Sequence, residues 1–302
     1  SKGIAKLGLS KDIPVSQFPA KLVLELRSLT RKYYDLTDER SAHINKLKGD
    51  LHTVFPQYLD VFCDVTGKTS TMILRQYGTP DKILRGHKKT MIEKISKASR
   101  KGLAKASERY EKLCAAANAA KTFGCQIDSI YFNIFLTLDL VEKLDSALDS
   151  ILNRIRQLIT FNKNEKFIQQ IKLLNTIPGV GFLTAVTIMC EIGDFSAFRN
   201  PKQLFAYFGL DPEVNESGKF VGTQLHMSKR GSRIARRAIF AVALASIRTK
   251  RNGEGINPYL RKYYELKSGQ KPKMVAIGAV MHKVCNIVFA VLYSGSVVKT
   301  KI

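Results

Sequence analysis

Two long stretches of helical periodicity constrain the fold of this chain more than any other feature of its sequence. Over 20–55, and again over 128–162, apolar residues recur every three or four positions. Each pattern predicts one apolar stripe along a long amphipathic helix. The second pattern is close to a heptad repeat, which fits an intermolecular coiled coil and a hairpin within one chain equally well.

The remaining sequence predicts a mostly α fold in three segments. No stretch of any length alternates apolar and polar residues as a half-buried strand does. After residue 164 the long helical patterns give way to short ones joined by glycine turns, which indicates a domain boundary near 163–166. We therefore predict a tail over 1–19, a helical hairpin or coiled-coil region over 20–164, and a compact helical domain over 165–302.

The charge of the chain indicates a polyanionic partner. Its 49 Lys and Arg against 25 Asp and Glu give a net charge of +24, for which nucleic acid is the usual explanation. The segment 82–112 carries eleven basic and three acidic residues, and 219–251 carries nine basic residues and no acidic one. Each segment fits either a solvated helix face or a surface that contacts phosphates.

Cysteines and apolar stretches exclude other classes of protein. The five cysteines form no CxxC pair and no cluster with histidines, which argues against a zinc site or a disulfide framework. The most apolar stretch, 275–292, is interrupted by His282 and Lys283, so we expect no transmembrane helix. These features predict a soluble protein of the cytoplasm.

Residues 173–185 predict a helix-hairpin-helix motif, in which a helix ends, a Pro-Gly-Val-Gly turn follows and a second helix begins. Gly179 and Gly181 would let the backbone approach a phosphate, whose charge would face the amides at the start of the second helix. An ordinary corner between two helices has the same pattern. Both glycines are therefore candidate nucleic-acid contacts.

A polar loop places Ser217 before Gly218 and Lys219. A Ser-Gly pair in a loop is most often only a turn, and a serine nucleophile needs a base or a metal to activate it. Glu216 and His226 are close in sequence, and neither is diagnostic. From the residues alone, Ser217 is a weak candidate for catalysis.

The segment 228–237 predicts a turn, a serine N-cap at Ser232 and a helix that begins with basic residues. Its arginines are spaced three and four apart, so they gather on one side of the helix. Cations at the start of a helix oppose its dipole unless an anion is bound there. We therefore predict phosphate contacts from Lys219, Lys229, Arg230, Arg233, Arg236 and Arg237.

Five motifs follow one another along the chain: Ile177-Pro-Gly-Val-Gly, Glu191-Ile-Gly-Asp-Phe, Phe205-Ala-Tyr-Phe-Gly-Leu, Glu216-Ser-Gly-Lys and Ser228-Lys-Arg-Gly. In this order they resemble the transposases of the insertion sequence 110 family. The likeness is strong over 165–294 and looser in the helical middle. It implies a site-specific DNA recombinase in which Ser217, at the position of the family's nucleophile, forms a covalent phosphoserine link to cleaved DNA.

The resemblance also implies a cofactor and partners. Members of the family have an N-terminal RuvC-like domain whose four acidic residues bind Mg²⁺, are guided by a structured non-coding RNA, and act as homo-oligomers, which here means a dimer or a tetramer. That domain ends in an Asp-x-x-Asp motif shortly before a segment like Gly3-Ile4-Ala5. We therefore expect 1–19 to be the tail of such a domain and this chain alone to lack the metal site. The alternative function is a non-catalytic helix-hairpin-helix protein that binds nucleic acid.

Overall fold

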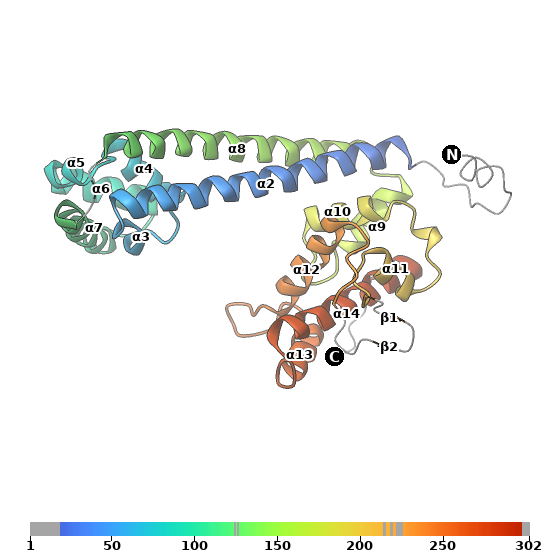
Figure 1. Cartoon of the computed structure of the whole chain (residues 1–302). Coiled ribbons are helices and arrows are strands. Elements are labelled where there is room, and N and C mark those ends of the chain that lie inside the picture. Colours follow the sequence, from blue (N-terminus) through green and yellow to red (C-terminus); the bar gives the residue numbers. More distant parts are fainter. Residues whose placement is uncertain are drawn as a thin grey trace. The chain divides into compact units, whose positions relative to one another are not determined.

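The computed structural model describes residues 19–123, 125, 127–213, 216–217, 220–221 and 226–297. Within them the chain forms the α-helices α2 to α14, one short 3₁₀ helix and a hairpin of two two-residue strands (Figure 1). The predicted mostly α fold class is confirmed.

The chain divides into two compact units. The middle unit is 33–151, and the terminal unit joins the described residues up to Lys32 with those from Leu152 onward. The division passes through two long helices, α2 (Lys21–Val54) and α8 (Asp128–Phe161). It differs from the boundary predicted near 163–166, because the start of α2 and the end of α8 pack with the terminal unit although no loop separates them from the rest of their helices.

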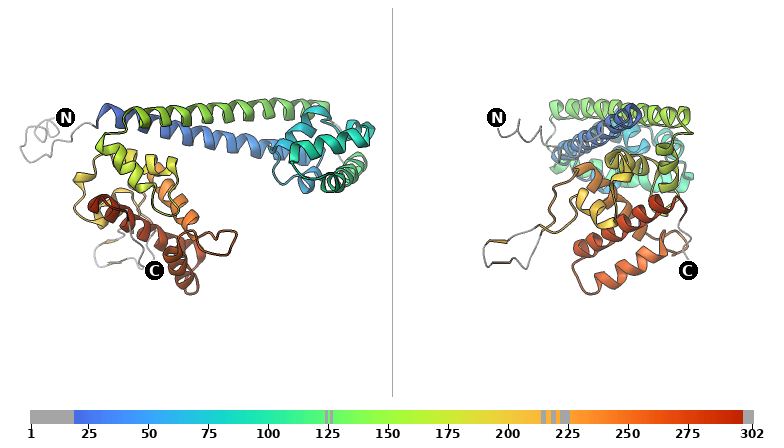
Figure 2. Two further views of the ribbon diagram at one scale, coloured as in Figure 1. Left: turned by 180° about the vertical axis from the view of Figure 1, so that it is seen from behind. Right: turned by 90° about the vertical axis from the view of Figure 1, so that its right-hand side faces the viewer.

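In the middle unit, the two long helices lie side by side within one chain (Figures 1 and 2). An ion pair between Arg40 of α2 and Asp145 of α8 joins them, and Leu36, Val141 and Leu148 are buried along them. Both periodic segments of the sequence are therefore single helices, as predicted. Of the two arrangements that the heptad pattern allowed, the structure contains the pairing within one chain.

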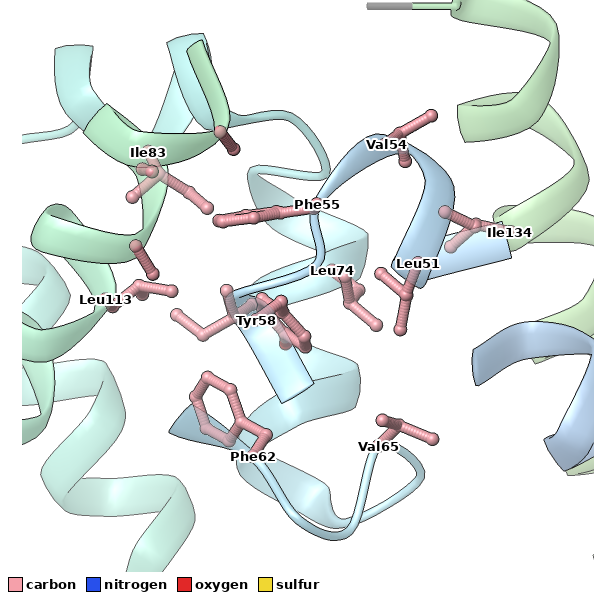
Figure 3. Packing of buried hydrophobic residues seen from close by; sticks show 14 of the residues in the cluster. Leu51, Val54, Phe55, Tyr58, Phe62, Val65, Leu74, Ile83, Leu113 and Ile134 are labelled. Atoms are coloured by element: carbon pink, nitrogen blue, oxygen red, sulfur yellow. The ribbon is translucent and has the colours of Figure 1, made fainter. Parts of the chain in front are cut away.

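Five further helices complete the middle unit: α3 (Tyr58–Val61), α4 (Lys68–Gln76), α5 (Pro80–Arg85), α6 (Lys88–Ser99) and α7 (Leu103–Phe123). Helix α7 packs against α3, α5 and α6. The core that they share with the long helices is apolar and includes the fully buried side chains of Phe55, Tyr58 and Leu113 (Figure 3). The buried Tyr58 hydroxyl is hydrogen-bonded to the Ser70 hydroxyl at 2.9 Å. This bond offsets the free-energy cost of burying the polar tyrosine hydroxyl in the core.

The terminal unit contains α9 (Lys166–Leu174), α10 (Phe182–Ile192), η1 (Phe195–Ala197), α11 (Pro201–Tyr207), β1 (Glu216–Ser217), β2 (Phe220–Val221), α12 (Arg233–Ile247), α13 (Pro258–Ser268) and α14 (Lys273–Ser294). Helix α14 packs against α9, α11, α12 and α13, and α12 also packs against α10. By length and composition α14 alone among the described helices could cross a membrane, but 56% of its most apolar stretch is buried inside the unit. Its apolar character is therefore explained by its position at the centre of this core.

Candidate nucleic-acid site

The turn between α9 and α10 is held by hydrogen bonds from buried side chains. The Pro178 carbonyl accepts from Ser246 Oγ and from Asn257 Nδ2, each at 3.3 Å. Gly179 has a φ of +100°, and a Cβ atom at this position would lie 2.1 Å from Ser246 Oγ. The close approach of α12 therefore requires glycine at 179, whatever else the turn does.

Gly181 has a different environment from Gly179. It is the exposed N-cap of α10, makes no side-chain capping bond, and nothing lies within 4 Å of the place where a Cβ would be. The first amides of α10 are therefore reachable for an anion at this end of the turn. The predicted phosphate contact remains a prediction for both glycines, and the packing favours Gly181.

Between α11 and α12 the chain forms a hairpin whose base is fixed by hydrogen bonds. Ser228 donates its backbone N–H to the Asp211 carbonyl at 2.8 Å and its hydroxyl to the Asp211 carboxylate at 2.6 Å. The Glu213 N–H donates to the His226 carbonyl at 2.7 Å. The two sides of the hairpin are thus joined before the strands β1 and β2 begin.

Ser217 is the last residue of β1, where it is paired with Phe220 of β2 in an antiparallel register (Figure 1). The sequence placed it in a polar loop, and the backbone places it in a short hairpin strand. Lys219 lies outside the described residues. The roles of both residues therefore stay predictions at this point.

The loop that follows the hairpin lies directly on the end of α11. A Cβ on Gly231 would come within 2.0 Å of the Tyr207 carbonyl oxygen, and one on Gly209 within 2.5 Å of the Gly231 nitrogen. The Lys229 N–H donates to the Gly209 carbonyl at 3.0 Å, and Lys229 itself has a left-handed φ of 54°. The backbone path of this basic loop is thus set by contacts between backbone atoms.

Arg236 holds the same loop in place. Its Nη1 donates to the carbonyls of Phe208, Lys229 and Gly231 at 3.2, 3.1 and 2.6 Å. We predicted Arg236 as a phosphate contact, and the structure gives its side chain a task in folding the loop. Three carbonyl acceptors on one nitrogen could not be foreseen from helical spacing.

The predicted serine N-cap of α12 is confirmed, because Ser232 Oγ accepts from the Ala235 N–H at 3.2 Å. Of the predicted phosphate contacts around this cap, Lys229, Arg230 and Arg233 are exposed and Arg237 is half-buried. The described cations of the motif other than Arg236 therefore present charge at the start of α12.

A pocket with a volume of about 570 Å³ lies beside this basic loop in the terminal unit. Sequence reasoning placed only one of its residues, Arg230, in the candidate site. Glu191 was noted only as part of a family motif, although its position as the one charged residue in the apolar helix α10 could have marked it as a site residue. The pocket is lined by Arg27, Arg31, Glu191, Ala206, Tyr207, Arg230, Gly231 and Ser232.

Glu191 is the organising residue of the pocket. Arg31 donates from Nε and Nη2 to its two carboxylate oxygens at 2.8 and 2.9 Å, and the Glu191 side chain is only 2% exposed. Tyr207 OH donates to the Glu191 carbonyl at 3.0 Å, and Arg27 Nε to the Cys190 carbonyl at 2.7 Å. Burial alone would raise the pKa of Glu191, but hydrogen bonds from Arg31 and Ser232 outweigh it and hold the pKa below its usual value.

This lowered pKa predicts how the stability of the chain depends on pH. Ionised Glu191 stabilises the fold above its unfolded pKa, near 4.5, and this contribution is lost as the pH falls through the lower folded pKa. We expect Glu191→Gln to lower the melting temperature at neutral pH. The difference in melting temperature between this variant and the unmodified protein should become smaller in acid. Thermal unfolding across the acid range measures this gap, and a gap that stays constant with pH contradicts the assignment.

Comparison with known proteins gives a consistent result. Residues 171–265 match the model of the transposase IS116/IS110/IS902 family. The chain is 23% identical over 279 residues to an uncharacterized 43.6 kDa protein of insertion element IS110 from Streptomyces coelicolor. The aligned region covers 91% of this chain and 64% of that protein. It is 30% identical to the pilin gene-inverting protein of Moraxella bovis over 165 residues, covering 54% of this chain and 48% of that one.

A third relative is the transposase for insertion sequence element IS1111A of Coxiella burnetii, which is 29% identical over 142 residues and matches 45% of this chain and 39% of its own length. The chain therefore spans at most about two thirds of these relatives. The match at 171–265 includes the hairpin, the basic loop and Glu191, whereas Arg27 and Arg31 lie outside it.

Proposed function

Since this chain belongs to the IS110 family of transposases, we propose that it is a DNA recombinase in which Ser217 attacks a phosphodiester. One observation supports this proposal most: the hairpin with Ser217 stands on a base fixed by Asp211 and Ser228, and the chain passes from that base directly into the basic loop before α12. Nucleophile and phosphate-binding residues thus belong to one continuous segment.

The chemistry assigned to this segment is a transesterification. The Ser217 oxygen forms a bond to phosphorus, the bond from phosphorus to the leaving DNA oxygen breaks, and the serine proton leaves while the freed DNA oxygen gains one. The charge that develops on the phosphate is stabilised by preorganised cations. Lys229, Arg230 and Arg233 at the start of α12 would supply them. Reversal of the step by a second DNA strand rejoins the backbone.

The family resemblance implies Mg²⁺, which the described residues do not fit. Among them no three His, Cys, Asp or Glu side chains come together as a ligand set. Of the carboxylates beside the hairpin and the pocket, Asp211 is engaged by Ser228 and Glu191 by Arg31. We propose that acidic residues of a RuvC-like segment, outside the described residues, bind the ion and activate the serine.

A structured guide RNA and a homo-oligomer are the partners that we propose from the resemblance. In the middle unit, α6 and α7 border a hollow of about 280 Å³ that is rich in lysine and arginine. Its cations are Lys101, Lys105, Arg109 and Lys112, against Asp60 and Glu108. This excess of positive charge supports an RNA contact there.

Covalent capture tests the proposed function. The full-length gene product is incubated with Mg²⁺, with RNA transcribed from the DNA that flanks its gene, and with labelled duplex of the same DNA, and complexes that survive detergent are counted. The proposal requires a protein–DNA adduct. Reversible binding with no adduct under any such condition would contradict it and favour the alternative, a non-catalytic nucleic-acid-binding protein.

Binding by phosphate contacts makes a second prediction, which concerns salt. Because each phosphate neutralised on duplex DNA contributes about −0.9 to the slope of log K against log salt, several contacts give a steep slope. The net charge of +24 and the acid-free run 219–251 lead us to expect this behaviour. Fluorescence anisotropy over a salt series measures the slope, and an affinity that hardly changes with salt contradicts phosphate-dominated binding.

A further inference from the structure

We propose that the pocket lined by Arg27, Arg31 and Arg230 binds a backbone phosphate of the DNA, and that Glu191 is a positioning residue for it. This inference rests on the proposed function and deepens it, since it names the group that the site recognises. It also adds two arginines of α2 that lie outside the matched region 171–265.

Size and charge of the pocket favour this ligand. A volume of about 570 Å³ far exceeds the roughly 30 Å³ that a water molecule occupies in the liquid. Three guanidinium groups face one carboxylate, which leaves the lining with an excess of positive charge. A guanidinium presents a planar fork of N–H donors that matches phosphate oxygens. A phosphodiester therefore fits the lining better than a neutral ligand does.

The arginines differ in how they are held. Arg230 is exposed, and no hydrogen bond or ion pair of its side chain is found with the other described residues. Arg31 is fixed by Glu191 and is still 49% exposed at the pocket. Arg27 is held by the Cys190 carbonyl at the end of α10. Two arginines are thus preorganised and one is open to the ligand, an arrangement that lowers the entropy cost of binding.

Glu191 connects the parts of this pocket. Its carboxylate fixes the plane of the Arg31 guanidinium, and Ser232, the N-cap of α12, lines the same pocket. The α2 arginine and the first turn of α12 thus border one pocket. Groups that orient a ligand-binding side chain in this way affect affinity although they do not touch the ligand.

A charge-neutral double variant tests the positioning role. Arg31→Gln with Glu191→Gln removes one cation and one anion, so the net charge is unchanged and the buried carboxylate is not left without its partner. We expect duplex affinity to fall about tenfold and the salt slope to lose about 0.9, the share of one phosphate. The matched control is Lys21→Gln with Glu25→Gln, an exposed ion pair of the same unit that lies outside both basic segments and should bind as the unmodified protein does.

If the Arg31/Glu191 double variant binds DNA with unchanged affinity and slope, the pair only docks α2 on α10 and the proposal is overturned. Should the double variant fail to fold, Arg230→Gln tests the pocket instead, because Arg230 is exposed and its replacement should not disturb the fold. The Arg230→Gln variant should also lose about 0.9 from the salt slope, whereas Arg199→Gln, which replaces an exposed arginine of the same unit outside the run 219–251, should lose less. Equal effects of these two single substitutions contradict a phosphate pocket.

These readouts are separable from the proposed function, because they measure reversible binding and need no cleavage. A pocket-dependent affinity without any covalent adduct would keep the pocket and reject the recombinase. If Ser217 forms the adduct but the pocket variants bind DNA as the unmodified protein does, the recombinase proposal is kept and the phosphate pocket is rejected.

Discussion

Replacing Ser217 by alanine should abolish the covalent protein–DNA adduct, while reversible DNA binding persists. The substitution removes the only oxygen that the proposed reaction uses as nucleophile, so adduct formation should fall below detection. Affinity should change by about tenfold at most, since a neutral hydrogen bond contributes roughly 0.5–1.5 kcal/mol. Detergent-resistant complexes and anisotropy, measured on the same protein, report the two quantities separately.

Two nearby serines serve as controls for this result. Ser228 is bonded to Asp211 at the base of the hairpin, and Ser232 caps α12. Replacing either by alanine should lower stability, by about 1 kcal/mol for a lost cap, and leave an adduct. If Ser217→Ala still forms the adduct, Ser217 is only a hairpin residue and these two serines become the candidates.

Gly231→Ala is expected to have the largest effect on the stability of the terminal unit. The new methyl carbon would lie 2.0 Å from the Tyr207 oxygen, 2.6 Å from the Phe208 carbonyl carbon and 2.8 Å from the Gly209 nitrogen. These are backbone atoms that cannot rotate away, so α11 and the basic loop must separate. We expect a loss of about 3 kcal/mol or more, at the upper end of overpacking effects.

The matched control for this substitution is Gly278→Ala. Gly278 lies inside helix α14, and nothing occupies the 4 Å around its would-be Cβ. Alanine there should stabilise the helix by about 0.5–1 kcal/mol, its propensity advantage over glycine. Thermal or denaturant unfolding of both variants gives the comparison, and a Gly231→Ala protein that melts with the unmodified one contradicts the packing of the loop on α11.

Features set by neighbours in the chain could be predicted from the sequence. The long helices follow from apolar spacing, and the Ser232 cap follows from a serine placed before a run of helix-forming residues. Such patterns depend on contacts between residues that are one or two helical turns apart. They can therefore be predicted without knowing how distant segments pack.

Features set by distant segments could not be predicted. The partner of Glu191 is Arg31, 160 positions away, and the reason for glycine at 179 is the approach of Ser246. Arg236 was assigned to phosphate from helical spacing, yet its Nη1 is bonded to three carbonyls of the loops packed on α12. In each case tertiary contact decides which of several tasks a residue has. The pocket was missed for the same reason.

The most direct measurement of the central claim is the identity of the residue that carries DNA in the adduct. After nuclease and trypsin digestion, Ser217, Ser228 and Ser232 fall in different peptides, 203–219, 220–229 and 231–233, and Ser217 is the only serine of the first. Mass spectrometry should find the nucleotide remnant on peptide 203–219, with fragment ions that place it on Ser217. A remnant on either of the other two peptides, or on a residue of 203–219 other than Ser217, would contradict Ser217 as the nucleophile.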